Sequence, residues 1–120
     1  MLSAVTVKIT GFTCATRVLP QKIYIASTFW GRLVGLLGRR SLSDAEGLLL
    51  IPCGDIHTFG MRFTIDVIFL DKSGKVIGFS DGVSPNRIRV SPGGTHSVLE
   101  LSDGNRKRTG INLDDRLIFD

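Results

Sequence analysis

Alternating hydrophobic and polar positions predict that most of this 120-residue chain forms β-strands. The residues Val5–Thr10 alternate with a period of two, which is typical of a strand with one buried face. The residues Phe63–Leu70 give the strongest strand prediction, because both of their faces are largely apolar. The other predicted strands are Lys22–Ala26, Gly47–Ile51, Lys75–Phe79, Arg87–Val90, His96–Leu101 and Arg116–Phe119.

A single amphipathic helix is predicted over about residues 28–38. Trp30, Leu33, Val34 and Leu37 recur at positions i, i+3, i+4 and i+7, a spacing that places apolar side chains on one face of a helix. One short helix among seven or eight strands, without regular β-α-β alternation, indicates a mainly β (α+β) fold. We therefore expect a compact antiparallel β-sandwich or barrel-like domain with this helix packed on it.

Turn and loop signals separate these elements. Asp71–Gly74 (DKSG) predicts a hairpin turn, with glycine available for a left-handed backbone conformation. Ser43–Glu46 (SDAE) has the spacing of a helix capping box, although only about one turn of chain follows it. Phe12–Pro20 has no clear period and is predicted to be a loop. Asp103–Gly110 (DGNRKRTG) is predicted to be a solvent-exposed turn.

Length and composition indicate one globular domain that spans residues 1–120. The hydrophobic share of 42% and the charged share of 22% are ordinary for a soluble protein. No apolar run approaches the roughly 20 residues that a membrane helix needs, and the N-terminus lacks the pattern of a secretory signal. Cys14 and Cys53 are the only cysteines, which favours a reducing compartment. We expect a soluble, cytoplasmic protein without a membrane span, as a monomer or weak oligomer.

The formal net charge is +4, and the basic residues are unevenly distributed. Residues 1–43 contain six Lys and Arg residues and no acidic residue, and Arg106–Arg108 (RKR) form a further cluster. Such asymmetry can mark a surface for nucleic acid or an acidic partner. A solvated basic face is the favoured interpretation, because nucleic-acid-binding surfaces combine basic patches with exposed aromatic residues. The phenylalanines here mostly occupy core-like positions.

Two acidic residues stand inside predicted strands. Asp66 lies within an apolar face of Phe63–Leu70, so its carboxyl group must find hydrogen-bond donors or a cation, or be protonated. It is therefore either a structural clamp or part of a functional site. Glu100 shares one face of His96–Leu101 with Val98, and we expect its side chain to face solvent.

The segment Pro52–Met61 (PCGDIHTFGM) carries the sharpest chemical clue. Cys53 and His57 are four residues apart, which places both on one face if the segment is a strand. Cys53 could act as a nucleophile with His57 as its base, or it could be a small core residue. A zinc site would need further ligands. The candidates for them, which follow no recognised metal spacing, are Cys14, Asp55, Asp66 and His96.

Four segments together resemble a known family: FWGRLVGLLGRRSLSDAEGLLL, PCGDIHTFGMRFTIDVIFLDKSGKVI, VLEL and GINLDDRL. They are similar to the small bacterial and archaeal domain called domain of unknown function 192. The similarity covers about residues 22–120, and residues 1–21 are predicted to add an N-terminal strand and loop. It implies a compact, mainly β sandwich-like domain without an established activity or cofactor. The positions that match the family pattern are Arg32, Gly35, Leu36, Arg39, Glu46, Gly47, Met61, Asp66, Phe69, Asp71 and Leu99–Leu101.

The chain departs from this family pattern at two places. It looks like the variant with PC-(x)2-IHT-(x)-GM, whereas many members lack the pair Cys53 and His57. Chemistry at that pair could therefore not be the function of the whole family. Near the C-terminus, the family usually reads Gly-Asp where this chain has Asp114 and Asp115. Asp114 is thus expected to adopt a turn conformation that glycine would take freely.

These observations favour a small non-catalytic ligand-binding or protein-interaction domain. Its expected pocket involves Cys53, His57, Met61 and Asp66, where PCGDIHTFGM passes the buried aspartate. No cofactor or metal is expected, and the partner would be an unknown small molecule or protein. One alternative is a metal-dependent or cysteine-based enzyme centred on Cys53 and His57. Another is a basic-surface domain that binds nucleic acid or an acidic partner.

Overall fold

The computed structural model describes residues 3–11, 16–26, 43–51, 56–57, 63–84, 88–89 and 91–119. Within these residues the fold is mainly β, as predicted, and it includes one short helix. The helix predicted over about residues 28–38 lies outside the described residues. No helix in the described part is both long and apolar enough to cross a membrane.

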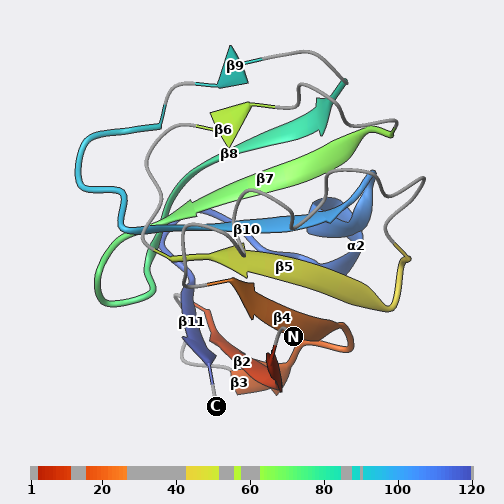
Figure 1. Cartoon of the computed structure of the whole chain (residues 1–120). Coiled ribbons are helices and arrows are strands. Elements are labelled where there is room, and N and C mark those ends of the chain that lie inside the picture. The colour runs from red at the N-terminus through yellow and green to blue at the C-terminus, as the bar shows by residue number, and fades with distance from the viewer. Residues whose placement is uncertain are drawn as a thin grey trace.

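A six-stranded sheet forms the centre of the molecule (Figure 1). Its strands, in spatial order, are β1 (Ser3–Val5), β4 (Lys22–Ala26), β5 (Glu46–Leu50), β10 (Ser97–Ser102), β7 (Ile65–Leu70) and β8 (Val76–Val83). Every neighbouring pair is antiparallel except β4 and β5, which run parallel. All residues of β7 and β10 are buried, which explains why neither sequence has a continuous polar face.

Two smaller sheets and a helix complete the described fold. The three-stranded antiparallel sheet lies below the large sheet in Figure 1 and consists of β11 (Arg116–Phe119), β2 (Val7–Thr10) and β3 (Thr16–Val18). A separate antiparallel pair consists of β6 (Ile56–His57) and β9 (Ile88–Arg89). Helix α2 (Asn105–Thr109) follows β10 closely and contacts both β10 and β7.

The two faces of the large sheet carry separate hydrophobic clusters. The first cluster, which includes Ile9 and Leu99, joins the large sheet to β2 and β11. The second cluster includes Leu48 and Val67. Successive side chains of a strand point to opposite faces, so the two clusters lie on opposite sides of the large sheet. This two-sided burial determines where each polar side chain of the central strands can lie.

Two strand predictions need correction. Thr16–Val18, predicted as part of a loop, forms β3 and pairs with β2. All three of its side chains are exposed, so no hydrophobic pattern signalled the strand. Val5–Thr10, predicted as one strand, divides at Thr6 between β1 and β2, which belong to different sheets. Backbone pairing, rather than side-chain periodicity, therefore determines that β3 is a strand and that β1 and β2 are separate strands.

The segment Asp103–Gly110, predicted as an exposed turn, contains helix α2. The residues at the two ends of the helix, Gly104 and Gly110, have left-handed backbone angles, with φ of 87° and 70°. Glycine reaches this region without steric cost, so the pair delimits the helix. A five-residue helix is too short to show a recognisable hydrophobic period, which explains the wrong prediction.

The predicted turn at Asp71–Gly74 is confirmed. The Asp71 carboxylate accepts the backbone N–H groups of Ser73 (2.8 Å) and Lys75 (3.0 Å). Gly74 has a φ of 84°, and a Cβ atom there would lie 2.3 Å from the carbonyl oxygen of Leu117. Only glycine therefore fits this turn without a shift of the backbone. Asp114, as expected, also takes a left-handed conformation, with φ of 70°.

Candidate functional site

The four residues of the expected pocket are only partly described. Cys53 and Met61 lie outside the described residues. His57 belongs to β6 through its backbone, and its side chain is likewise outside the described part. Asp66, on β7, is described completely. Whether the four side chains converge therefore stays a prediction.

Asp66 is a buried carboxylate, 1% exposed, whose two oxygens both accept hydrogen bonds from the backbone. Oδ1 accepts the N–H of Gly82 at 2.9 Å, and Oδ2 accepts the N–H of Arg106 at 2.9 Å. The side chain thus joins β7 to β8 and to the beginning of α2. These contacts correspond to the structural clamp that the sequence allowed, because backbone donors occupy both oxygens.

Arg106 forms a second buried polar cluster beside this clamp. Its guanidinium group donates two hydrogen bonds to the Asp81 carboxylate, at 2.7 Å and 2.6 Å, and one to the Ile111 carbonyl at 3.0 Å. It also lies 3.9 Å from the centroid of the Phe79 ring. The hydrogen bonds from Arg106 lower the pKa of Asp81. Because Arg106 is 6% exposed, the RKR cluster presents only Lys107 and Arg108 to solvent.

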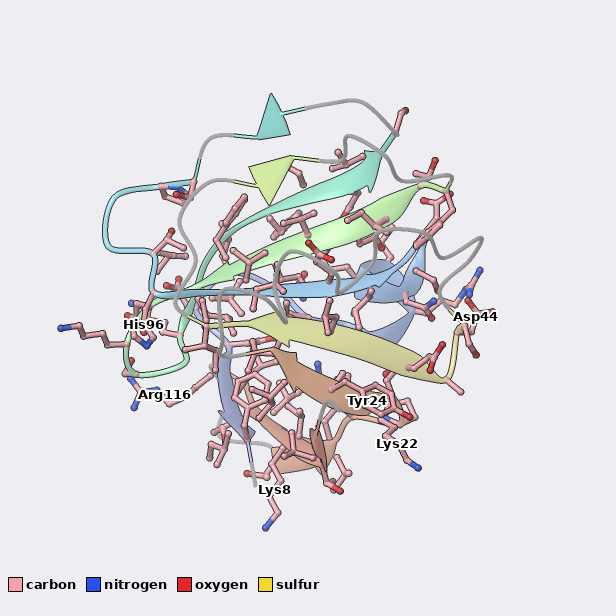
Figure 2. The ribbon with its side chains drawn as sticks, in the orientation of Figure 1. Lys8, Lys22, Tyr24, Asp44, His96 and Arg116 are labelled. Carbon is pink, nitrogen blue, oxygen red and sulfur yellow. The ribbon has the colours of Figure 1, made fainter. Side chains whose placement is uncertain are left out.

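Other basic side chains are spread over the surface rather than gathered on one face. Figure 2 shows Lys8, Lys22 and Arg116 extending from separate parts of the molecule. Among the residues that the structure describes, no three His, Cys, Asp or Glu side chains are grouped so that they could hold a metal ion.

Glu100 was expected to face solvent, and this expectation is wrong. Its side chain is 5% exposed and lies on the face of the second hydrophobic cluster. Its direct neighbours across the sheet are Leu48 on β5 and Val67 on β7, both buried. Burial raises the pKa of Glu100 to about 8, because a charged carboxylate is poorly solvated there. The one useful sequence signal was Val98, which shares this face of β10 with Glu100 and shows that the face is not wholly polar.

Glu100 and Asp66 point to opposite sides of the large sheet. In the register of β10 with β7, Glu100 faces Val67, whereas Asp66 faces Leu101. Leu101 belongs to the first cluster and Val67 to the second. The two acidic groups therefore cannot share one cavity on a single face of this sheet.

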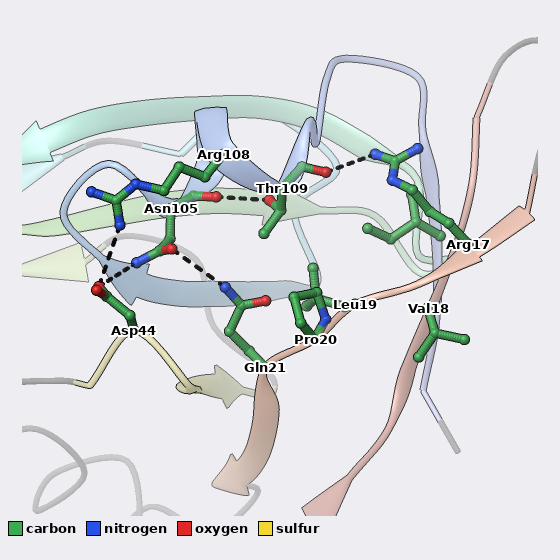
Figure 3. Close-up of a pocket in the computed structure, with 10 residues that line it drawn as sticks. Arg17, Val18, Leu19, Pro20, Gln21, Asp44, Asn105, Arg108 and Thr109 are labelled. Atoms are coloured by element: carbon green, nitrogen blue, oxygen red, sulfur yellow. Dashed lines mark hydrogen bonds and ion pairs between the residues drawn. The ribbon is translucent and has the colours of Figure 1, made fainter.

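A hollow of about 420 Å³ lies between the β3–β4 connection and α2 (Figure 3). Its lining residues are Ile9, Arg17, Val18, Leu19, Pro20, Gln21, Asp44, Asn105, Arg108 and Thr109. The Asp44 carboxylate accepts hydrogen bonds from Ser102 Oγ (2.7 Å) and Asn105 Nδ2 (2.8 Å), which lower the pKa of Asp44. Arg108 lies 3.6 Å from the same carboxylate. The hollow thus has an ionised carboxylate at one end.

Gln21 and Arg17 form the rest of the polar lining. Gln21 is 4% exposed, and its Nε2 reaches Asn105 Oδ1 at 3.5 Å. The Gln21 Oε1 atom is buried and has no hydrogen-bond partner. Arg17 donates to the carbonyl oxygens of Thr109 (3.0 Å) and Gly110 (2.8 Å), which fixes its guanidinium group at the other end. No pattern in the sequence indicated this site, because its residues come from distant segments.

Two crystal structures have closely similar folds. A protein from Sinorhizobium meliloti 1021, described as a proposed transcription regulator, aligns with a TM-score of 0.86 and 22% identity. The alignment covers 98% of this chain and 95% of that protein. A protein of unknown function from Novosphingobium aromaticivorans DSM 12444 aligns with a TM-score of 0.82 and 25% identity, over 96% of this chain and 84% of that protein. No curated protein matches the sequence.

The family comparison covers nearly the whole chain. The sequence profile of DUF192, described as uncharacterized ACR, COG1430, matches residues 12–119. This range includes all strands of the described fold except β1 and β2, as well as helix α2. The chain therefore belongs to the DUF192 family of uncharacterised domains.

Proposed function

We propose that this domain is a non-catalytic binding domain, and that its ligand contacts Glu100 on the second face of the large sheet. The observation that carries the proposal is the burial of this carboxyl group between Leu48 and Val67. Within the described residues, no hydrogen bond or ion pair reaches it, and burial alone raises its pKa. A buried polar group without a partner is costly, so its retention is explained if a ligand supplies the partner.

The segment Pro52–Met61 belongs to the same proposal. Phe63 packs against the cluster that contains Leu48 and Val67, so the chain reaches this face two residues after Met61. Cys53, His57 and Met61 are thus candidates to line the site beside Glu100. Asp66 supports the site indirectly, because it fixes β7 from the opposite face.

The protonated carboxyl group of Glu100 determines which hydrogen-bonding groups the ligand must carry. A neutral carboxylic acid presents one O–H donor and one acceptor, so it pairs with an amide-like edge. The surrounding side chains are apolar, so the rest of the ligand would be apolar as well. We therefore expect a small, mostly apolar molecule with one amide or similar group.

The proposal is tested by a fragment screen using ligand-observed NMR at pH 7. Amide-bearing fragments are screened against the wild type, Glu100→Gln and Glu100→Leu. The Gln variant keeps the size and a donor–acceptor edge, whereas the Leu variant keeps only the apolar volume. We expect bound fragments to lose affinity about tenfold or more in the Leu variant, and less in the Gln variant.

A second readout tests the position of the site. In a Cys14→Ser background, Cys53 is the only thiol, and bound fragments should slow its alkylation. Asp114→Asn is a control, because Asp114 is an exposed carboxylate whose ion-pair partner is Lys75. Fragments that bind Glu100→Leu as well as the wild type would refute the proposal, as would the absence of any binding fragment. Circular dichroism confirms that each variant is folded.

An enzyme centred on Cys53 and His57 is the alternative from another functional class. It predicts stoichiometric metal in the purified protein, or a Cys53 thiol whose alkylation rate reports a low pKa. Elemental analysis and a pH profile of alkylation distinguish it from a binding domain. Metal below stoichiometry together with an ordinary thiol would count against the enzyme.

A further inference from the structure

The hollow of Figure 3 forms a second polar site, independent of Glu100. Two of its lining residues, Ile9 and Leu19, belong to the first hydrophobic cluster, whereas Glu100 lies on the face of the second. The hollow therefore opens on the other side of the large sheet. Its occupant can be inferred from three features of its lining.

The first feature is the buried acceptor of Gln21. Figure 3 shows the Gln21 amide oxygen directed toward Leu19 and Pro20, while the amide nitrogen faces Asn105. The oxygen has no hydrogen-bond partner, and Gln21 is 4% exposed. An acceptor in this position requires an N–H or O–H donor. An anion without a hydrogen, such as sulfate or chloride, cannot supply one, so the occupant must carry an N–H or O–H donor.

The second feature is the charge of the lining. Two guanidinium groups, those of Arg17 and Arg108, and one carboxylate, that of Asp44, line the hollow, which gives the lining a formal charge of +1. Arg17 lies at the other end from Asp44 and is 3.9 Å from the Asp115 carboxylate, so Arg108 is the cation beside Asp44. Hydrogen bonds from Ser102 and Asn105 lower the pKa of Asp44, so this carboxylate stays ionised at neutral pH. The hollow is therefore complementary to one negative group. Arginine pairs especially well with a carboxylate, which matches its planar geometry.

The third feature is the apolar wall and its open edge. Val18, Leu19 and Pro20 provide hydrophobic surface, and Val18 is 58% exposed. Val18 ends β3, an edge strand that pairs only with β2 within the described part of the chain. Its outer edge thus offers backbone donors and acceptors to an extended chain.

We propose that this hollow binds the carboxylate end of a peptide. A backbone N–H of the peptide donates to Gln21 Oε1, its terminal carboxylate pairs with Arg108, and an apolar side chain packs on Leu19. Peptides combine these three groups, and an extended backbone also fits the open edge of β3. The source is either a free short peptide or the C-terminus of a partner protein, since both present the same chemistry.

The test uses the full chain and all tripeptides built from Ala, Leu and Val. Each is measured twice, with a free C-terminal carboxylate and as the C-terminal amide, first by thermal shift and then by calorimetry for the strongest binders. We expect the amides to bind about tenfold or more weakly, because they lose the charge-assisted pair with arginine. Equal binding of both forms would overturn the proposal, as would no binding of any tripeptide at millimolar concentration.

Matched variants assign the contacts. Arg108→Gln should weaken binding about tenfold, whereas Lys107→Gln, which removes a neighbouring exposed cation outside the lining, should not change it. Gln21→Leu removes the acceptor and should also weaken binding. Should Gln21→Leu fail to fold, the Arg108 and Lys107 pair decides, because Arg108 is 64% exposed and Lys107 is exposed. Equal effects of the two cation variants would contradict the site.

Peptide length distinguishes the two sources. Extension of the best tripeptide by four residues at its N-terminus should preserve or raise the affinity if the natural ligand is a protein C-terminus. A loss of affinity on extension indicates a free short peptide, because the site would then also close around the amino end.

Discussion

Asp66 and Glu100 are buried acidic residues on neighbouring strands, but they differ in their hydrogen-bond partners. Asp66 faces the first hydrophobic cluster and has backbone N–H donors on both oxygens, at 2.9 Å each. Glu100 faces the second cluster, and no described residue donates to it, so burial raises its pKa to about 8. Both side chains are therefore buried, but only Asp66 has hydrogen-bond donors for its carboxyl oxygens.

This difference separates a structural role from a functional one. The partners of Asp66 come from β8 and α2, so its carboxylate holds the fold together. Glu100 contributes no such connection within the described residues, and a hydrophobic residue of similar size would fill its position more favourably. An acid that costs stability without joining elements is a candidate for binding.

Removal of Asp66 should produce the largest effect on stability. Asp66→Ala removes the acceptor of two N–H groups, the part-buried one of Gly82 and the buried one of Arg106. Each unsatisfied donor costs about 1–3 kcal/mol, so the free energy of unfolding should fall by about 4 kcal/mol in urea denaturation. The exposed residue Asp103 provides a control, because Asp103→Ala should change stability far less. Equal effects of the two variants would refute the clamp.

The pH dependence of Glu100 should produce an effect of similar size. The folded-state pKa of about 8 lies above the ordinary value of 4.5, so the folded chain keeps a proton that the unfolded chain loses between these values. Stability should therefore fall as the pH rises from 4.5 to 8, by about 4–5 kcal/mol, and then level off. Glu100→Gln should lack this fall. Urea denaturation across this range checks it, and parallel curves for both proteins would contradict it.

Asp81 shows how much hydrogen-bond partners contribute to stability when the acidic residue is partly exposed. Its carboxylate receives two hydrogen bonds from Arg106, which lower the pKa of Asp81, and its side chain is 38% exposed. Asp81→Asn should cost only about 1 kcal/mol, because solvent screens the pair and the amide keeps one acceptor. In the wild type, this contribution is lost as the pH falls through the lowered pKa. Acid denaturation should therefore show a difference in stability between the wild type and Asp81→Asn only at pH values above the pKa of Asp81.

Substitution of Asp114, an exposed acidic residue with a left-handed backbone conformation, should produce the smallest change in stability. Its φ is 70°, and its carboxylate lies 3.3 Å from Lys75 Nζ. Asp114→Gly relieves about 1 kcal/mol of backbone strain but loses the ion pair and makes the unfolded chain more flexible. We expect a net gain of about 0.5 kcal/mol in thermal denaturation. A loss above 1 kcal/mol would show that the exposed ion pair matters more than the backbone.

Much of the fold was predictable because its central strands have strong local signals. The runs around β5, β7 and β10 are apolar, and the turn before β8 is fixed by Asp71 and Gly74. The short elements β3 and α2 were missed, since three exposed residues and five helical residues carry no period. The parallel pairing of β4 and β5 was not predicted either, because the hydrophobic pattern of a strand does not determine the direction in which it pairs.

The polar sites were less predictable, because their partners come from distant residues. The need of Asp66 for donors could be inferred from the strand pattern, but not that Gly82 and Arg106 supply them. Glu100 was placed wrongly because strand alternation does not say which face meets solvent when both faces are covered. The hollow at Gln21 combines segments more than 80 residues apart, which no local pattern indicates.

The most direct test of the account is the titration of the Glu100 side-chain carboxyl group. NMR measurement of its side-chain carboxyl carbon, assigned by comparison with Glu100→Gln, follows this single group in the folded protein. We predict a midpoint near pH 8, with Glu100 neutral at pH 7. A midpoint near the ordinary value of 4.5 would show that Glu100 already has partners or solvent, and would contradict the proposed binding role.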